Sequence, residues 1–149
     1  MLAVMQAAVT AARLVLGLIL VVAGALKMGH APALASSIAG FRLLSPGVIP
    51  LLALALPPLE IFLGLYLVLG LFTRIAGIAA AVLFLLYAGA IASAVLRGIP
   101  ANCGCFGPAD AATADWPHVG FDLLLMALGA FIALGAPGAL ALDRRWTPR

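Results

Sequence analysis

The chain has 149 residues, of which 66% are hydrophobic and only 9% are charged. Soluble domains carry about a quarter charged residues, so this composition excludes a soluble globular domain and indicates an integral membrane protein. The net charge of +3 includes no long Lys/Arg run, so the sequence indicates no nucleic-acid binding and only membrane lipid as a general partner.

We predict an all-α, four-helix membrane bundle in a single domain covering residues 1–149. Its spans lie at about residues 7–28, 48–71, 74–97 and 117–141, and a Cys-Gly-Cys loop occupies residues 98–116. The first span could be taken for a secretory signal peptide, but the first twelve residues contain no Lys or Arg. Gly17 and Gly24 lie near one face of this span, which favours close contact with a neighbouring helix.

Arg13 and Lys27 border the uncharged core of the first span. Long basic side chains near helix ends can extend to the lipid headgroups, and this accounts for both residues without a function. Between the first and second spans, Leu34, Ile38 and Phe41 share one helical face. This pattern predicts a short amphipathic helix on the membrane, which would cover the cysteine loop if both lie on the same side.

The second span contains Pro57 and Pro58, which predict a kink, followed at once by Glu60. A carboxyl group near the middle of a membrane is costly and marks a function or an obligatory partner. Counting the helical rise from the span ends places Glu60 and Arg13 at similar depths, so we predict a Glu60–Arg13 pair. Two alternatives stay open: Glu60 is neutralised and only fixes helix packing, or it serves a substrate or a proton relay.

Three further residues are candidates for supporting roles. Tyr87 in the third span places a hydroxyl inside the bundle, although a buried tyrosine commonly only packs and makes one hydrogen bond. Arg97 ends the third span just before the cysteines and is a candidate for stabilising a thiolate. Asp115 is expected to cap the N-terminus of the fourth span. Asp122 lies in the early turns of that span, where the helix dipole favours an anion without any function. The alternative for Asp122 is that it accepts the thiol proton.

Both cysteines, Cys103 and Cys105, lie one residue apart in the loop after the third span. A disulfide between them needs a bend at Gly104, and the strained ring would be reduced easily, which suits exchange better than bracing. The flanks indicate an exposed turn: Pro100, Asn102, Gly107 and Pro108. The alternatives are a soft-metal clamp for Cu(I), Zn or Hg through both thiolates, and a chance pairing in a structural assembly subunit.

The basic residues are distributed unequally between the two ends of the predicted bundle. The end with both termini holds five of them and the cysteine end three: Arg13, Arg74, Arg144, Arg145 and Arg149 against Lys27, Arg42 and Arg97. The positive-inside rule therefore predicts cytoplasmic N- and C-termini in a multi-pass protein of the cell (inner) membrane. The cysteine loop would then face the oxidising, extracytoplasmic side.

Several of these residues also carry a resemblance to a known family. The sequence resembles the DoxX-like membrane proteins and, among them, the methylamine-utilisation MauE group of redox-associated proteins. The matching residues cover most of the chain: Arg13, Gly17, Gly24, Lys27, Leu59, Glu60, Gly64, Gly70, Arg74 and the segment Cys103-Gly104-Cys105-Phe106-Gly107. The resemblance implies a four-helix bundle that passes redox equivalents to an extracytoplasmic thioredoxin-like partner, which in the methylamine system helps mature a disulfide-rich dehydrogenase subunit. Related DoxX-type proteins are linked to quinone-coupled sulfur oxidation.

Taken together, residues and resemblance predict a membrane thiol-disulfide exchange protein, with Cys103 and Cys105 as the catalytic pair and a thioredoxin-fold protein as the partner. Only two cysteines are present, so no second dithiol can relay electrons across the bundle. A quinone is the simplest electron acceptor, and we expect it near the Pro57 kink. Its candidate contacts are Glu60, Arg13 and Tyr87. Soft-metal binding or transport and a structural assembly role are the competing hypotheses.

Overall fold

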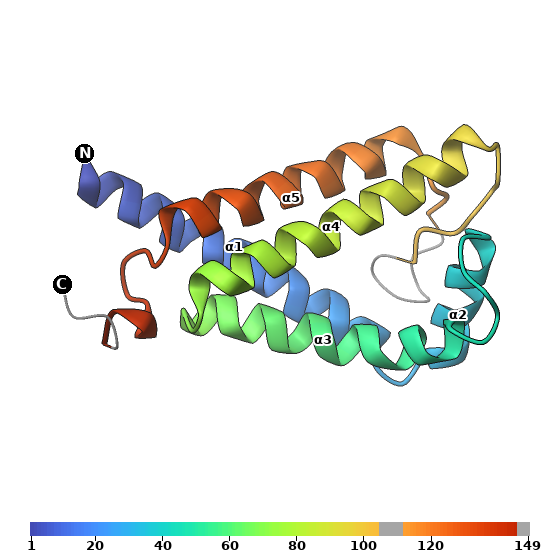
Figure 1. The fold of residues 1–149 in the computed structure, drawn as a ribbon, viewed down its shortest axis with the longest axis horizontal. Coiled ribbons are helices and arrows are strands. Elements are labelled where there is room, and N and C mark those ends of the chain that lie inside the picture. The colour runs from blue at the N-terminus through green and yellow to red at the C-terminus, as the bar shows by residue number, and fades with distance from the viewer. Residues whose placement is uncertain (105–111, 146–149) are drawn as a thin grey trace.

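The computed structural model describes residues 1–104 and 112–145, and this part of the chain forms helices and no named strand. The elements are α1 (Leu2–Lys27), α2 (Ala31–Gly40), α3 (Ile49–Leu69), α4 (Thr73–Leu96), α5 (Trp116–Gly135) and the 3-10 helix η1 (Leu142–Arg145) (Figure 1). Four of them, α1, α3, α4 and α5, are long and apolar enough to cross a membrane. The predicted all-α bundle, with a short helix between its first two spans, is therefore confirmed.

Side-chain caps mark where α4 and α5 begin. The two carboxylate oxygens of Asp143 accept hydrogen bonds from the backbone N–H groups of Phe72 and Thr73, at 2.7 and 2.6 Å. Asp115 accepts a hydrogen bond from the backbone N–H of His118 at 3.0 Å, which confirms the predicted cap of the fourth span. A second Asp115–His118 contact through the imidazole Nδ1 lowers the pKa of Asp115 below its usual value.

Small residues let the long helices approach in two close pairs, α1 with α3 and α4 with α5. A Cβ on Gly17 would lie 2.8 Å from the backbone oxygen of Gly64, and a Cβ on Gly64 would lie 2.5 Å from that of Gly17. Gly77 and Gly129 make the corresponding approach between α4 and α5. Only glycine fits at such distances, so the close contact predicted for the first span is confirmed.

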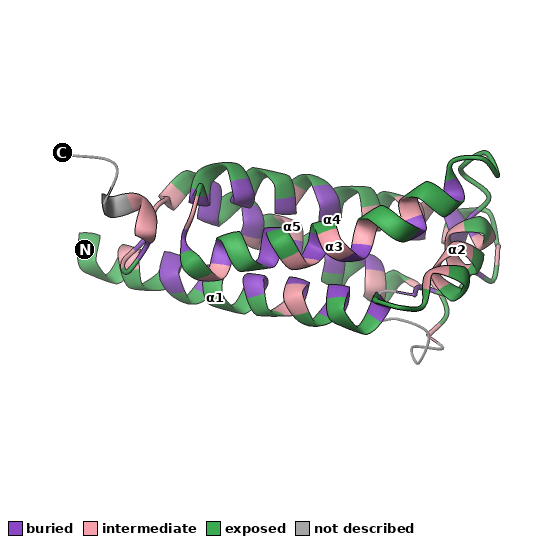
Figure 2. Ribbon diagram, turned by 90° about the horizontal axis from the view of Figure 1, so that it is seen from below, coloured by how far each residue is buried: buried purple, intermediate pink, exposed green. Residues whose placement is uncertain are grey.

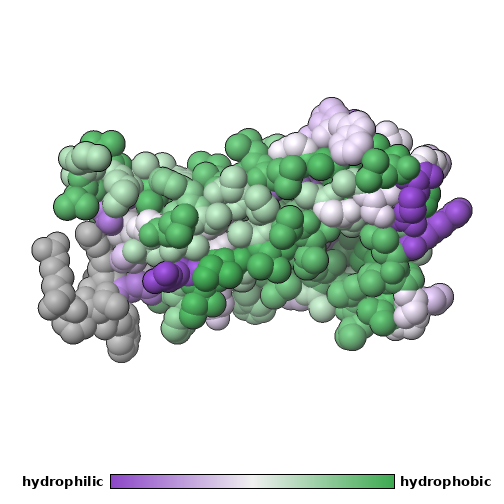
Figure 3. All heavy atoms as spheres, turned by 45° about the horizontal axis from the view of Figure 1, so that its top comes forward, coloured by the Kyte–Doolittle hydropathy of each residue, from purple (hydrophilic) through white to green (hydrophobic). Residues whose placement is uncertain are grey.

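Apolar side chains face both the interior and the exterior of the bundle. Buried residues lie on the inward helix faces (Figure 2), with a core that includes Leu16, Leu20, Leu67, Phe84 and Ile132. The outward faces are also rich in large apolar side chains, and Figure 3 shows them covering the middle of the molecule while hydrophilic side chains gather toward its ends. Helices that are apolar all round fit a lipid environment.

The two ends of the bundle are built from different parts of the chain. The N-terminus, η1 and the α3–α4 turn lie at one end, whereas α2 and the segment leading to Cys103 lie at the other (Figure 1). This arrangement is the one expected for four spans. Which end faces the cytoplasm stays a prediction.

The fourth long helix ends at Gly135, short of the predicted boundary near residue 141. Pro137 explains the early end, because proline lacks an N–H donor and disfavours helical backbone in the residue before it. The chain then folds over the terminal end of the bundle, where the Thr10 hydroxyl donates to the carbonyl of Ala139 at 2.8 Å. Arg13 donates to the carbonyl of Pro137 at 3.1 Å, so it binds this C-terminal segment.

The glycine contact between α1 and α3 can be tested by adding a single methyl group. We expect Gly64→Ala to destabilise the protein by about 1–3 kcal/mol, because the added Cβ would overlap the backbone of α1. Gly89→Ala is the matched control, since a Cβ at Gly89 meets nothing within 4 Å. Thermal unfolding in detergent, followed by circular dichroism, compares the two variants; equal melting temperatures would contradict this packing.

Candidate functional site

A buried polar cluster joins three of the long helices. It consists of Lys27 at the end of α1, Glu60 in α3 and Tyr87 in α4. The Lys27 ammonium donates to both carboxylate oxygens of Glu60, at 2.7 and 2.9 Å, and the Tyr87 hydroxyl donates to Glu60 Oε1 at 2.7 Å. Lys27 is 4% exposed and Glu60 only 1%. Charges removed from water this completely need such hydrogen bonds to offset their desolvation.

The structure shows that the predicted Glu60–Arg13 pair is wrong. Glu60 pairs with Lys27, whereas Arg13 lies against Gly70 and donates to the carbonyl of Pro137 at the opposite end of the bundle. Lys27 does not extend to the headgroups either, since its ammonium is buried. Arg13 is therefore separate from the Glu60–Tyr87 cluster with which the sequence grouped it.

The reason for this difference is the stagger between α1 and α3. The sequence estimate placed the ends of the two helices level, but Gly24 near the end of α1 packs against the carbonyl of Pro57, which is more than two turns inside α3. Since α1 ends at Lys27, only three residues after Gly24, the first turns of α3 extend beyond the end of α1. This offset brings Lys27 to the depth of Glu60 and moves Arg13 to that of Gly70.

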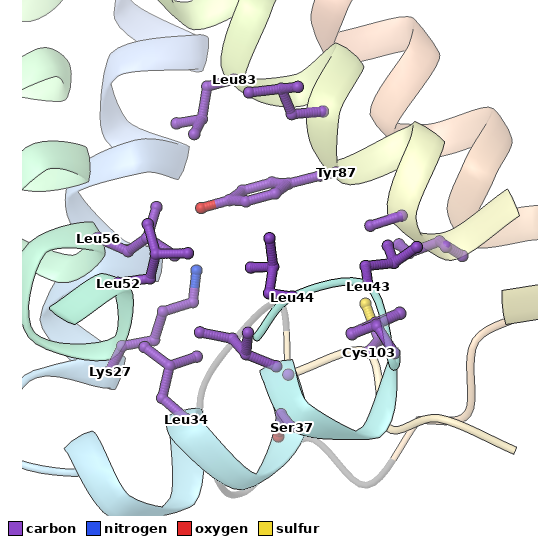
Figure 4. A pocket seen from close by; sticks show the side chains of 16 residues that line it. Lys27, Leu34, Ser37, Leu43, Leu44, Leu52, Leu56, Leu83, Tyr87 and Cys103 are labelled. Atoms are coloured by element: carbon purple, nitrogen blue, oxygen red, sulfur yellow. The ribbon is translucent and has the colours of Figure 1, made fainter. Parts of the chain in front are cut away.

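Beyond the end of α1 the structure contains a cavity of about 360 Å³. Helices α3 and α4 and the segment containing α2 form most of its walls, and leucine is the most frequent lining residue (Figure 4). Lys27 and Tyr87 contribute the charged and hydroxyl groups at one side, and Cys103 and Gly104 lie at another. In Figure 4 the Cys103 sulfur points toward the cavity. The cavity therefore connects the buried polar cluster with the cysteine segment.

Cys103 is disulfide-bonded and held by its backbone. Its N–H donates to the carbonyl of Ala112 at 2.9 Å, while the side chain of Asn102 accepts from the N–H of Gly104 at 3.1 Å. Gly104 has a φ of +61°, in the left-handed region that favours glycine, so the predicted bend at this residue is confirmed. Cys105 lies outside the described residues, as do Phe106, Gly107, Pro108 and Asp110 of the predicted loop.

The turn at Cys103 is less exposed than its composition indicated. Cys103 is only 8% exposed and packs among apolar residues that include Phe41, Ile91 and Val119. The short helix α2 adds to this cover, because Ser37 lies directly over Gly104, with its side chain 3.1 Å from where a Cβ would be. The expectation that α2 covers the cysteine loop is confirmed for the part of that loop which the structure describes.

Arg97 holds α2 in this position. Its guanidinium donates to the carbonyls of Phe41 and Arg42, just after α2, at 2.5 and 3.5 Å, and to the carbonyl of Ser93 in its own helix at 3.0 Å. These bonds tie the end of α2 to the end of α4. The predicted effect of Arg97 on a thiolate stays a prediction.

Asp122 is buried in α5, with 4% of its surface exposed. Its Oδ2 atom has no hydrogen-bond partner among the described residues. Asp122 lies on the buried, inward face of α5. Its predicted role as acceptor of a thiol proton stays a prediction.

Sequence reasoning overlooked Lys27 as a site residue, although the chain offered a signal. Lys27 is the single lysine and Glu60 the single glutamate of the whole sequence, and both fall inside or beside predicted spans. Opposite charges that are both placed in lipid are expected to pair. Within residues 1–104 and 112–145, no group of three His, Cys, Asp or Glu side chains is arranged to hold a metal ion.

The buried pair predicts a specific pattern of stability changes. We expect Lys27→Met to destabilise the protein by about 3–5 kcal/mol, because it leaves the Glu60 carboxylate buried without its cation. Adding Glu60→Gln should recover much of this loss, since the amide removes the charge and still accepts from Tyr87. Thermal unfolding in detergent measures both effects, and a Lys27→Met variant as stable as the wild type would contradict the pairing.

The site lies within a region that matches known proteins. A family model described as methylamine utilisation protein MauE matches residues 5–135, which include the buried cluster, the cavity and Cys103. A protein of Paracoccus denitrificans named "Methylamine utilization protein MauE" is 35% identical over 131 residues, covering 87% of this chain and 70% of that protein. No solved structure matches the chain.

Proposed function

The chain belongs to the family of the methylamine utilisation protein MauE, and we propose that it is a membrane thiol-disulfide oxidoreductase serving methylamine utilisation. Cys103 and Cys105 form its redox-active pair and exchange redox equivalents with an extracytoplasmic thioredoxin-fold partner. The observation that carries the proposal is the disulfide-bonded state of Cys103 at the covered end of the bundle. A bridge across a single residue closes almost no loop, so it contributes little to stability and suits exchange.

The exchange is a pair of thiolate attacks. A partner thiolate attacks one sulfur of the disulfide and forms a mixed disulfide, and the second partner thiol then displaces this chain's remaining sulfur. The partner gains a disulfide and loses two electrons, while Cys103 and Cys105 take up two electrons and two protons as thiols. Because Cys103 is only 8% exposed, we assign the partner's attack to Cys105. Cys103 is then the sulfur that leaves when the mixed disulfide forms, and it stays on the side of the cavity.

The charge distribution supports an extracytoplasmic position for this pair. More basic residues belong to the end that holds the termini and the α3–α4 turn than to the cysteine end. The termini then lie in the cytoplasm, and the cysteines face the side of the inner membrane where disulfides persist. This placement gives a periplasmic or equivalent thioredoxin-like partner direct access, in keeping with the resemblance to DoxX-like proteins.

Thiol labelling tests the redox state and the sidedness together. In spheroplasts treated with a membrane-impermeant maleimide, we expect no labelled protein before reduction and a mass shift after mild reduction. The Cys103→Ser, Cys105→Ser double variant is the control and should take no label. Labelling that needs permeabilised membranes would overturn the proposed orientation, and full labelling without reduction would contradict a resting disulfide.

Replacement of either cysteine tests whether the pair is required. In a host whose native copy is replaced, we expect Cys103→Ser and Cys105→Ser each to abolish growth on methylamine, because neither variant can both form and resolve a mixed disulfide. The Gly89→Ala variant, whose added methyl group points into open space, should grow normally. Undiminished growth of both cysteine variants, with protein levels checked by immunoblot, would refute the proposed chemistry.

A further inference from the structure

The cavity beside Cys103 has the character of a small-molecule site. Its volume of about 360 Å³ falls in the range of ligand pockets, and its walls are mostly apolar. The polar groups that reach it are few and come from defined places: Lys27 and Tyr87 at one side, and Ser37 with the cysteine segment at another. A ligand of this site is therefore mostly apolar, with a small number of polar atoms.

The buried cluster offers a hydrogen-bond donor to such a ligand. An ammonium group has three N–H donors, and Lys27 uses two of them on the oxygens of Glu60. Glu60 also accepts from Tyr87, so the carboxylate holds both donor groups in fixed positions. Lys27 lines the cavity with one N–H still unused, so its cation can stabilise negative charge developing on a ligand oxygen, whereas the Tyr87 hydroxyl already donates to Glu60.

The disulfide-bonded Cys103 lines the same cavity, which makes a redox-active ligand the best fit. The chain has two cysteines in all, so no second dithiol of this chain can take electrons from the pair. We propose that this cavity binds the headgroup of a lipid-soluble quinone, with one carbonyl oxygen at Lys27, and that the quinone reoxidises the Cys103–Cys105 dithiol. This inference rests on the proposed exchange function and adds its electron acceptor.

The helix arrangement favours a ligand that arrives from the lipid. α3 contacts α4 far less than it contacts α1, and the cavity takes Leu52 and Leu56 from α3 and Leu83 and Leu86 from α4. Leu86 is 64% exposed on the outer surface of the bundle. The cavity wall therefore continues into the membrane-facing surface, along which an isoprenoid tail can extend.

The reaction balances without a further reactant. Two S–H bonds break and one S–S bond forms, which releases two electrons and two protons. The quinone takes up both, and its two carbonyl oxygens become the hydroxyl groups of the quinol. The sequence predicted Glu60, Arg13 and Tyr87 as quinone contacts. In this proposal Glu60 does not contact the quinone but positions Lys27 and Tyr87, and Arg13 takes no part because it lies at the other end of the bundle.

Purified full-length protein in quinone-free nanodiscs, with decylubiquinone as the probe, tests the inference. We expect saturable binding of one decylubiquinone per chain, retained in the Cys103→Ser, Cys105→Ser double variant. The dithiothreitol-reduced wild type, after desalting, should reduce one equivalent of decylubiquinone, as followed by its ultraviolet absorbance. Ala90→Phe, which fills the cavity, should lower affinity and rate by about tenfold or more.

Matched variants make the outcome specific. Ala79→Phe adds the same ring to an exposed position of α4 and should leave both quantities unchanged. Leu52→Trp fills the cavity from α3 and serves if Ala90→Phe does not fold. Two results would overturn the inference. One is the absence of saturable binding, which would leave a lipid chain as the occupant of the cavity. The other is an equal rate of quinone reduction in the wild type and in a folded cavity-filling variant.

A separate readout distinguishes this inference from the exchange function on which it rests. Reduction of the disulfide by dithiothreitol, followed by the mass shift after maleimide treatment, does not involve the quinone. Normal reduction without quinone binding refutes the quinone site alone. Quinone binding to a protein whose cysteines never cycle refutes the exchange function, and with it the role of the quinone as oxidant.

Discussion

The structure depends on one desolvated ion pair, between Lys27 and Glu60. Burying two charges in an apolar bundle is costly, and the cost is offset only while the ammonium and the carboxylate stay in direct contact. That requirement, together with the close glycine contacts between α1 and α3, fixes how far α1 slides along α3, and the hydrogen bond from Tyr87 extends the constraint to α4. Leucine-rich helices could pack in several registers with similar energy, whereas this pair is satisfied in one.

The register set by that pair also creates the cavity. α1 ends at Lys27, while the first turns of α3 continue beyond it, so at this end of the bundle α1 no longer packs beside the other long helices. The segment containing α2 fills this position only in part, and Arg97 fixes its end through backbone carbonyls. The same covering segment buries Cys103, which places a disulfide-bonded sulfur and a buried cation around one apolar space.

The opposite end of the bundle is closed by the chain after α5. Asp143 caps α4, Arg13 donates to the carbonyl of Pro137, and the Thr10 hydroxyl donates to the carbonyl of Ala139. Each contact satisfies a polar group that would otherwise lie unpaired beside lipid. The two basic residues of α1 thus have separate tasks: Arg13 secures the terminal end, and Lys27 organises the cavity and the cysteine end.

The sequence by itself determined the features that depend on composition and local chemistry. Four long apolar helices, the short helix between the first two, the cap at Asp115, the close glycine contacts and the bend at Gly104 all follow from residues adjacent in sequence or on one helical face. Only the tertiary structure decided the partner of Glu60, the location of Arg13 and the burial of Cys103. The physical reason is that these depend on the axial stagger of α1 and α3 and on how α2 folds over the bundle end. Hydrophobic periodicity identifies which face of a helix is buried, but it carries no information on how far that helix slides along its neighbour.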